Sequence, residues 1–145
     1  MKVYKFLLII TILLFSNLIQ SQSVFAKWKT IDDRTGNPKA IINIYEKHGL
    51  MFAEVSKIVE PGKENSLCTK CDGDMKDMPV IGMTIIKDGI KNADNEWKGT
   101  FLFDPEQAMT FRFKIWLNPD NSNELKVRGY LAFLFRTQTW LRVDE

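Results

Sequence analysis

A strict two-residue alternation of apolar and polar side chains is the feature that most constrains how this chain folds. In the stretch MTFRFKIWL, residues 109–117, every second side chain is apolar. Successive side chains of an extended chain point to opposite faces, so this pattern predicts a strand between a core and water. Trp116 falls on the polar face, which makes it a candidate contact residue on the outer surface. The predicted core face consists of Phe111, Phe113, Ile115 and Leu117.

The same alternation continues in ELKVRGYLA, residues 124–132, and the NPDNSN segment between the two runs has the composition of a turn. The two runs therefore predict a hairpin. Weaker patterns predict further strands at 24–31, 40–46, 50–59, 97–103 and 137–143. In the 50–59 run, one predicted face carries Met51, Ala53, Val55 and Val59. Residues 79–90 are apolar enough for either a strand or a short buried helix.

Glycines and prolines fall mostly between these runs, and no helix of crossover length separates one predicted strand from the next. Many short strands with turn residues between them are typical of antiparallel sheets rather than of βαβ units. The sequence therefore predicts an all-β domain over residues 22–145. We expect an antiparallel up-and-down β-barrel of about eight strands, closed or nearly closed.

The first residues have the pattern of a secretory signal peptide. Lys2 and Lys5 precede an apolar run from Phe6 to Phe15, after which the chain turns polar. We predict a signal peptide over residues 1–21, with cleavage after residue 21 or residue 23. The run is shorter than the roughly 20 apolar residues that span a bilayer, so no membrane span is expected. The predicted location is the periplasm or the extracellular medium.

Removing residues 1–21 takes away two lysines and no acid, so the formal net charge falls from +2 to zero. The remaining chain has no block of like charges that would neutralise a row of phosphates. We therefore expect no nucleic-acid partner.

Both cysteines lie in SLCTKCDGD, residues 66–74, with two residues between them. In an oxidising compartment a disulfide between Cys68 and Cys71 is expected, and it would order the connection before residues 79–90. Two alternatives remain open. A zinc site would need further ligands, such as His48 or a nearby aspartate. A thiol redox site would need the cysteines at a helix N-terminus, whereas these lie in a loop of a β protein.

The chain shows no motif of a known catalytic or metal site. His48, the single histidine, lies in a predicted hairpin loop next to Gly49, as expected for an exposed turn residue. Asp32 and Asp33 fall in another turn, and the aspartates after Cys71 lack the full calcium-loop pattern. We therefore expect no enzyme activity, no cofactor and no bound metal.

Several segments resemble a bacterial exported family, the domain of unknown function 2147. They are AKWKT, SLCTKCDGDMKDMPVIGMTII, Trp97, the FDP at 103–105 and LKVRGYLAFLFRTQTW, of which LKVRGY and RTQTW are the most specific. The resemblance implies a lipocalin-like β-barrel in a periplasmic or secreted setting, with no assigned activity. This chain departs from the family pattern after FDP, where Glu106, Gln107, Ala108 and Met109 replace an Asn-Gly-Lys turn.

The resemblance also implies a pair of residues that closes the barrel. In lipocalin-like barrels an arginine near the last strand covers a tryptophan on the first strand. Trp28 is similar in placement to that tryptophan, and Arg136 or Arg142 to the arginine. Of the two, we take Arg136 as the predicted partner of Trp28, in a structural role.

Two functions remain from the sequence. In the first, the barrel is a non-catalytic binding module whose interior accepts a small apolar or amphipathic ligand. In the second, the barrel is filled and serves as an envelope structural or protein-interaction domain, with Trp116 and Tyr130 on its contact face. Ten phenylalanines and four tryptophans indicate that part of the interior is filled. The predicted ligand-lining residues are Phe111, Phe113, Ile115, Leu125 and Val127.

Overall fold

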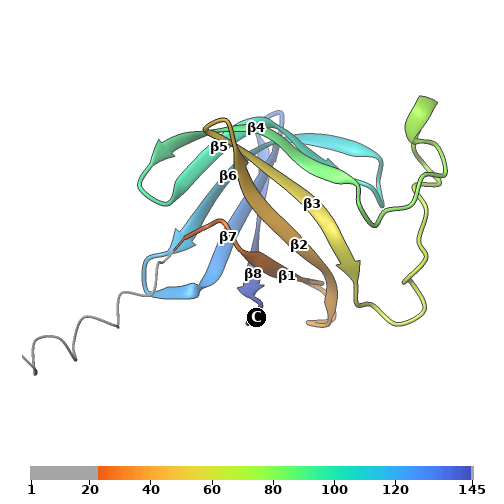
Figure 1. Ribbon diagram of the computed structural model, residues 1–145, viewed down its shortest axis with the longest axis horizontal. Helices are drawn as coiled ribbons and strands as arrows, with labels where there is room; N and C mark the ends of the chain where they lie inside the picture. Colours follow the sequence, from red (N-terminus) through yellow and green to blue (C-terminus); the bar gives the residue numbers. More distant parts are fainter. Residues whose placement is uncertain (1–22, 145) are drawn as a thin grey trace, which may run out of the picture.

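The computed structural model describes residues 23–144, and eight strands within them close into one barrel (Figure 1). Each strand pairs antiparallel with its sequence neighbour, and β1 also pairs with β8. The predicted signal peptide, residues 1–21, lies outside the described residues. Within them, no helix is long and apolar enough to cross a membrane. The strands are β1 Lys27–Ile31, β2 Pro38–Lys47, β3 Leu50–Ile58, β4 Thr84–Ala93, β5 Glu96–Asp104, β6 Met109–Asn118, β7 Asn121–Leu131 and β8 Leu134–Arg142.

The predicted closed antiparallel barrel is confirmed. The apolar segment 79–90 contributes a strand rather than a helix, although β4 begins only at Thr84. Residues before Thr84 belong to a long connection, in which Leu67 and Pro79 form an isolated antiparallel bridge. That connection also holds a single 3₁₀ turn, η1, at Gly73–Met75.

The alternation predicted along β3 is wrong at its end. Met51, Ala53 and Val55 are buried as predicted, but the next buried side chain is Ile58 and Val59 is half-buried. The cause is a bulge, because the register with β2 shifts between Ile41 and Ile42 and leaves an extra residue in β3. An extra residue moves every following side chain to the opposite face of a strand.

The up-and-down topology sorts the connections between the two ends of the barrel. The β1–β2, β3–β4, β5–β6 and β7–β8 connections lie at one end, called the mouth from here on. The β2–β3, β4–β5 and β6–β7 turns lie at the other end, together with the chain that enters β1. Figure 1 shows the long β3–β4 connection projecting beside the barrel.

The end opposite the mouth is closed by buried side chains. Trp28 is fully buried there, and its indole N–H donates to the carbonyl of Val24 at 2.8 Å. Phe25 packs edge-on against Trp97, with ring centroids 5.2 Å apart. These contacts plug the barrel with the residues that lead into β1. The same end buries Met51, Ile115, Leu117 and Leu125.

The arginine that covers Trp28 is Arg142, so the predicted partner Arg136 is wrong. The guanidinium carbon of Arg142 lies 4.4 Å from the Trp28 ring centroid, and the two residues are paired across β1 and β8. Arg142 also donates to the carbonyls of Ser122 and Ser23. Arg136 is six residues earlier on β8, roughly 20 Å away along a strand, at the mouth. Burial lowers the pKa of Arg142, which remains positively charged.

Phe113, in the middle of the barrel, packs against two glycines, one on the neighbouring strand β5 and one on β4. Phe113 is 2% exposed. A Cβ placed on Gly99 would lie 2.6 Å from the Phe113 ring, and one on Gly89 would lie 3.0 Å from it. The ring therefore packs directly on the backbones of β4 and β5, and no side chain fits between them.

The predicted Cys68–Cys71 disulfide agrees with the structure, in which the two sulfur atoms lie at bonding distance and the Cα atoms are 5.4 Å apart. Both cysteines are buried with Phe103 in a small second cluster that attaches the β3–β4 connection to the barrel. The backbone N–H of Cys68 donates to Met78, and its carbonyl accepts from Asp77. Cysteines joined in this way offer no thiolate to zinc.

Candidate functional site

The mouth half of the barrel is hollow. A cavity of about 850 Å³ opens there, and its deepest walls are apolar. Ile42, Val55, Ile85, Val127 and Trp140 form these walls, and each is at most 6% exposed. They come from β2, β3, β4, β7 and β8, so the cavity is enclosed around nearly the whole barrel.

The structure divides the predicted lining residues between the hollow half and the filled half. Phe111 and Val127 line the cavity. Phe113, Ile115 and Leu125 lie deeper and belong to the packed core, so for them the predicted role as cavity lining is wrong. Alternation identified the inward face of β6 and β7, but it carries no information on depth along the barrel axis.

Several lining residues were missed because their sequence signal is weak. Ile58 turns inward only because of the β3 bulge. Gly129 lines the cavity without a side chain, and a Cβ there would lie 3.6 Å from Phe111, which is ordinary contact distance. Trp140 lies in the predicted strand 137–143, where Leu141 beside it is apolar as well, so alternation did not decide which of the two faces inward. Its inward position follows from the pairing of Leu125 with Trp140.

Two polar side chains reach the cavity below the rim. The side-chain oxygen of Gln138 accepts a hydrogen bond from the indole N–H of Trp140 at 3.1 Å. The NH₂ group of Gln138 takes no part in that bond. Thr30 accepts from the backbone N–H of Ala40 at 3.1 Å. A molecule bound at the floor of the cavity thus meets apolar side chains, with the Gln138 amide and the Thr30 hydroxyl nearer the rim.

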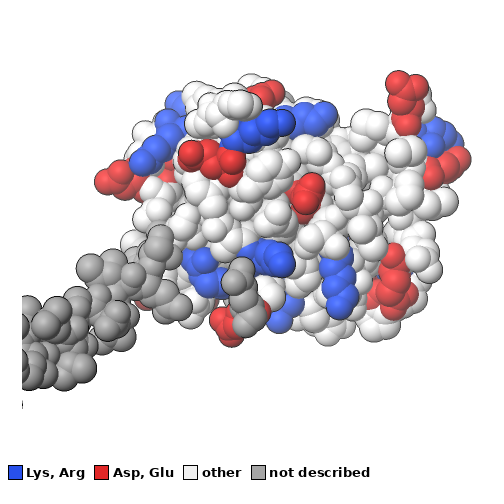
Figure 2. All heavy atoms as spheres, in the orientation of Figure 1, with Lys and Arg blue, Asp and Glu red and all other residues white. Residues whose placement is uncertain are grey.

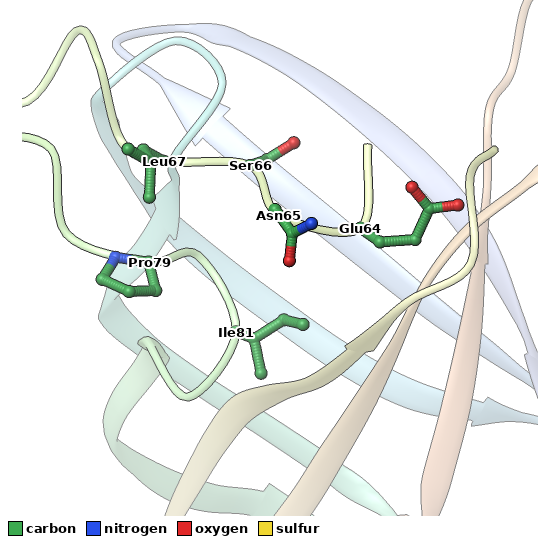
Figure 3. Close-up of a pocket in the computed structure, with 6 residues that line it drawn as sticks. All are labelled: Glu64, Asn65, Ser66, Leu67, Pro79 and Ile81. Carbon is green, nitrogen blue, oxygen red and sulfur yellow. The ribbon is translucent and has the colours of Figure 1, made fainter. Parts of the chain in front are cut away.

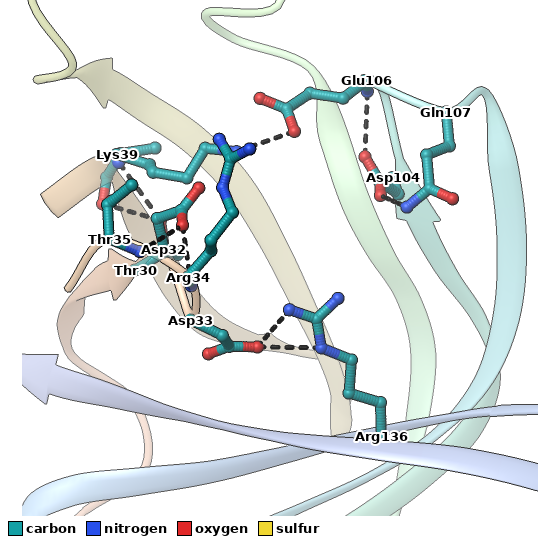
Figure 4. Close-up of polar contacts among 11 residues, drawn as sticks. Thr30, Asp32, Asp33, Arg34, Thr35, Lys39, Asp104, Glu106, Gln107 and Arg136 are labelled. Carbon is teal, nitrogen blue, oxygen red and sulfur yellow. Dashed lines mark hydrogen bonds and ion pairs between the residues drawn. The ribbon is translucent and has the colours of Figure 1, made fainter. Parts of the chain in front are cut away.

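Charged side chains form the rim of the mouth (Figure 4). Lys39 on β2 reaches Glu106 in the β5–β6 turn at 2.7 Å, and Arg136 on β8 pairs with Asp33 in the β1–β2 connection. Burial acts to lower the pKa of Lys39, but the hydrogen bond and charge of Glu106 outweigh it, so that pKa is raised above 10.5. One ion pair thus joins β2 to the β5–β6 turn, and the other joins β8 to the β1–β2 connection.

The turns below these pairs are held by carboxylates. Asp32 accepts from the backbone N–H groups of Thr35 and Arg34, each at 2.9 Å, and these bonds lower the pKa of Asp32. Asp104 accepts from the backbone N–H of Glu106 and from the side chain of Gln107. This is how the chain builds the β5–β6 turn without the Asn-Gly-Lys sequence of the family pattern. Ala108 there adopts a left-handed φ of 52°.

A second, smaller hollow of about 160 Å³ lies within the β3–β4 connection (Figure 3). It is bounded by the segment from Glu64 to Leu67 and by Pro79 and Ile81. Leu67 and Ile81 are both more than 40% exposed, so this hollow is a shallow surface feature.

The other residues considered from the sequence lie away from the cavity. His48 is exposed in the β2–β3 turn at the closed end, with φ 53°. Trp116 is half-buried on the outside, where Lys114 and Arg128 lie over its ring at 5.3 and 5.1 Å. Within residues 23–144, no group of three or more His, Cys, Asp or Glu side chains is arranged to hold a metal ion. On the face shown in Figure 2, acidic and basic side chains are interspersed among uncharged ones.

The barrel is therefore open at the mouth, where charged side chains form a rim above an apolar floor. Packed side chains close its other end. Residues 26–142 match the model of a bacterial family described as "Uncharacterized protein conserved in bacteria (DUF2147)". The chain belongs to this family. The match includes all eight strands, so DUF2147 in this chain is the barrel itself.

The DUF2147 barrel is also similar to a solved structure. It is described as "Protein HP1028 from the human pathogen Helicobacter pylori belongs to the lipocalin family". The two share 15% sequence identity with a TM-score of 0.71, over 85% of this chain and 84% of that chain. At this identity the likeness shows the fold, which is lipocalin-like. No curated protein sequence matches the chain.

Proposed function

We propose that this DUF2147 barrel is a non-catalytic binding module that holds a small apolar or amphipathic ligand in its mouth cavity. The observation that carries the proposal is an open cavity of about 850 Å³ at the mouth of a closed barrel, with a charged rim and apolar side chains at its floor. Small-molecule sites typically measure roughly 300 to 1,000 Å³ and combine apolar walls with a few polar groups. This cavity meets both criteria.

The distribution of polarity favours an amphipathic ligand. An apolar tail fits between Ile85, Val127 and Trp140, where contact with water is nearly absent. A polar head then lies beside Gln138 and the rim ion pairs of Lys39 and Arg136. Exposed ion pairs contribute little stability, so these cations can exchange their carboxylate partners for a ligand headgroup at small cost.

The proposed setting is outside the cytoplasm. Residues 1–21 have the pattern of a signal peptide, and a disulfide between Cys68 and Cys71 suits an oxidising compartment. The alternative of a filled barrel receives support only for the closed half, where Phe113 and Trp28 occupy the interior. The hollow mouth half favours ligand binding over a purely structural role.

Uptake of cis-parinaric acid, a fluorescent fatty acid, tests the proposal on protein that lacks residues 1–21. The described residues close the barrel without that segment. We expect saturable energy transfer from tryptophan to the probe with about one site per chain, because Trp140 lines the cavity. A Gly129→Leu variant places a side chain in the cavity and should weaken binding by at least about ten-fold.

The matched control for this experiment is Ile90→Leu, which changes an exposed residue of β4 away from the mouth. Its binding should equal that of the unmodified protein. Probe binding that is absent, or that is equally strong in the Gly129→Leu variant, would contradict the proposed site.

A further inference from the structure

The β7–β8 hairpin at the mouth exposes a concentrated group of apolar side chains. Phe133 is 89% exposed, Leu134 and Phe135 are each 62% exposed and Leu131 is 46% exposed. These four residues, called the apolar tip, surround the turn at Ala132 and Phe133. A soluble surface rarely leaves several large apolar side chains together without a partner.

The location of exposed apolar residues is biased toward the mouth. Over residues 23–144, nine large apolar side chains are exposed, and seven of them lie on the β3–β4 connection or the apolar tip. Only Ile90 and Leu141 lie elsewhere. The three most exposed of the nine, Phe133, Leu134 and Phe135, all belong to the apolar tip, at the end where the cavity opens.

The apolar tip is apolar on both faces of its hairpin. Leu131 pairs with Leu134, in line with the cavity-lining face, whereas Tyr130 pairs with Phe135 on the outer face. A protein partner covers one face of a hairpin, but a lipid layer surrounds an inserted hairpin completely. Within the hairpin the two strands pair with each other, and the carbonyl of Ala132 accepts from Arg112 at 3.1 Å.

Cationic and aromatic side chains lie at the base of this hairpin. Arg112 lies over the Tyr130 ring at 5.8 Å, and Arg128 lies over Phe135 at 4.6 Å and over Trp116. Neither arginine is within ion-pair distance of a carboxylate of the described chain. Arginine and amphipathic aromatic rings favour the headgroup level of a membrane.

The two arginines lie at different distances from the tip of the hairpin. The backbone of Arg112 is opposite Tyr130, about 10 Å along the strand from Phe133, but its guanidinium extends to the turn and donates to the carbonyl of Ala132. Amphipathic elements bury their apolar side chains roughly 5–10 Å below the headgroups. With Phe133 at that depth, the guanidinium of Arg112 lies beside the inserted turn, and Arg128, opposite Thr137, lies nearer the lipid phosphates.

From these observations we propose that the apolar tip docks the barrel on the surface of an anionic phospholipid membrane, with the cavity mouth beside the lipid. The β3–β4 connection is four strands away across the barrel and carries five acids against three lysines. It is therefore repelled from an anionic surface, and the barrel tilts toward the hairpin side. The docking requires no ligand in the cavity, so its test gives an answer whether or not the proposed function is correct.

Flotation with vesicles tests this docking, using protein without residues 1–21. Vesicles contain either phosphatidylcholine alone or phosphatidylcholine with 30% phosphatidylglycerol. We expect binding to the mixed vesicles to be at least five-fold stronger, because each cation near an anionic surface adds to the attraction. Phe133→Ser should weaken binding about ten-fold, as expected for losing one inserted phenylalanine. Ile90→Ser, an exposed apolar residue elsewhere, should leave it unchanged.

Three results would overturn the docking proposal. The unmodified protein fails to float with mixed vesicles, or both serine variants lose the same amount of binding. The third result is a protein that is dimeric without lipid and becomes monomeric with Phe133→Ser, because the apolar tip would then bind a second copy of the chain. Thermal unfolding of each variant verifies that the barrel is intact, since Phe133 makes no core contact at 89% exposure.

Discussion

Two glycines that face the barrel interior are predicted to respond in opposite ways to the same substitution. A Cβ at Gly99 would lie 2.6 and 2.8 Å from two Phe113 ring atoms and 3.4 Å from the Gly89 Cα. A Cβ at Gly129 would lie at ordinary distances, 3.6 Å from Phe111 and 3.8 Å from Leu102. The first position belongs to the filled half and the second to the cavity.

The magnitude for Gly99→Ala follows from the packing of Phe113. The ring must retreat by about 0.8 Å to restore a 3.4 Å contact, yet it is 2% exposed and also packs on Gly89. Overpacking a well-filled core costs about 1–3 kcal/mol, and replacing glycine returns about 0.4–1 kcal/mol through the unfolded chain. The net loss is about 1–2 kcal/mol, or a fall in Tm of roughly 3–8 °C for a domain of this size.

Gly129→Ala also restricts the unfolded chain, but it has no packing cost in the folded barrel. Its Tm should therefore stay unchanged or rise by a few degrees. Differential scanning calorimetry of both variants measures the contrast. If Gly99→Ala is as stable as Gly129→Ala, the description of a filled half below a hollow half is wrong.

Three further predictions concern the base of the barrel, the disulfide and the response to acid. Arg142→Leu should lower the free energy of unfolding by about 2 kcal/mol or more, because it removes the indole stack and leaves two carbonyls without their donor. Arg136→Leu should cost at most about 1 kcal/mol in the same urea titration, since it breaks only an exposed pair. Cys71→Ser should cost at most about 2 kcal/mol and raise hydrogen exchange in residues 59–83, and equal loss of protection in every strand would contradict a local role. Urea titrations across pH should show that stability falls in acid. Asp32 has its pKa lowered from 3.8 chiefly by backbone N–H groups, and Glu124 from 4.5 chiefly by Asn118, so their contribution is present above those values and lost as the pH falls through the native values. Unchanged stability from pH 6 to pH 3 would contradict this assignment.

The strands were predictable because alternation is a local property. In MTFRFKIWL, neighbouring residues differ in polarity, and this difference alone indicates which of them faces the core. The β6 side chains Phe113, Ile115 and Leu117 are buried as the pattern indicates. The end of β3 was not predictable, because the bulge depends on the register with β2 and no residue in SKIVE marks it. Register is a property of two strands, and one strand's sequence contains only half of it.

The cavity was less predictable than the barrel for a similar reason. Phe111 and Phe113 are two residues apart on one face, yet one lines the cavity and the other fills the core. Their difference arises from Gly99 on β5 and Gly89 on β4, which allow the Phe113 ring to pack directly on the backbones of these two strands. Likewise, the choice of Arg142 over Arg136 depends on the pairing of β1 with β8, which closes the barrel.

Native mass spectrometry tests the central claim, that the mouth cavity holds a small ligand, most directly. The protein is purified from its own host without reducing agent, as the unmodified chain and as the Gly129→Leu variant. The account predicts one non-covalent small molecule on the unmodified chain and a markedly lower occupancy in the variant, with both masses two hydrogens below the reduced chain. An unmodified chain that is bare, and that also takes up no added cis-parinaric acid, would contradict the claim.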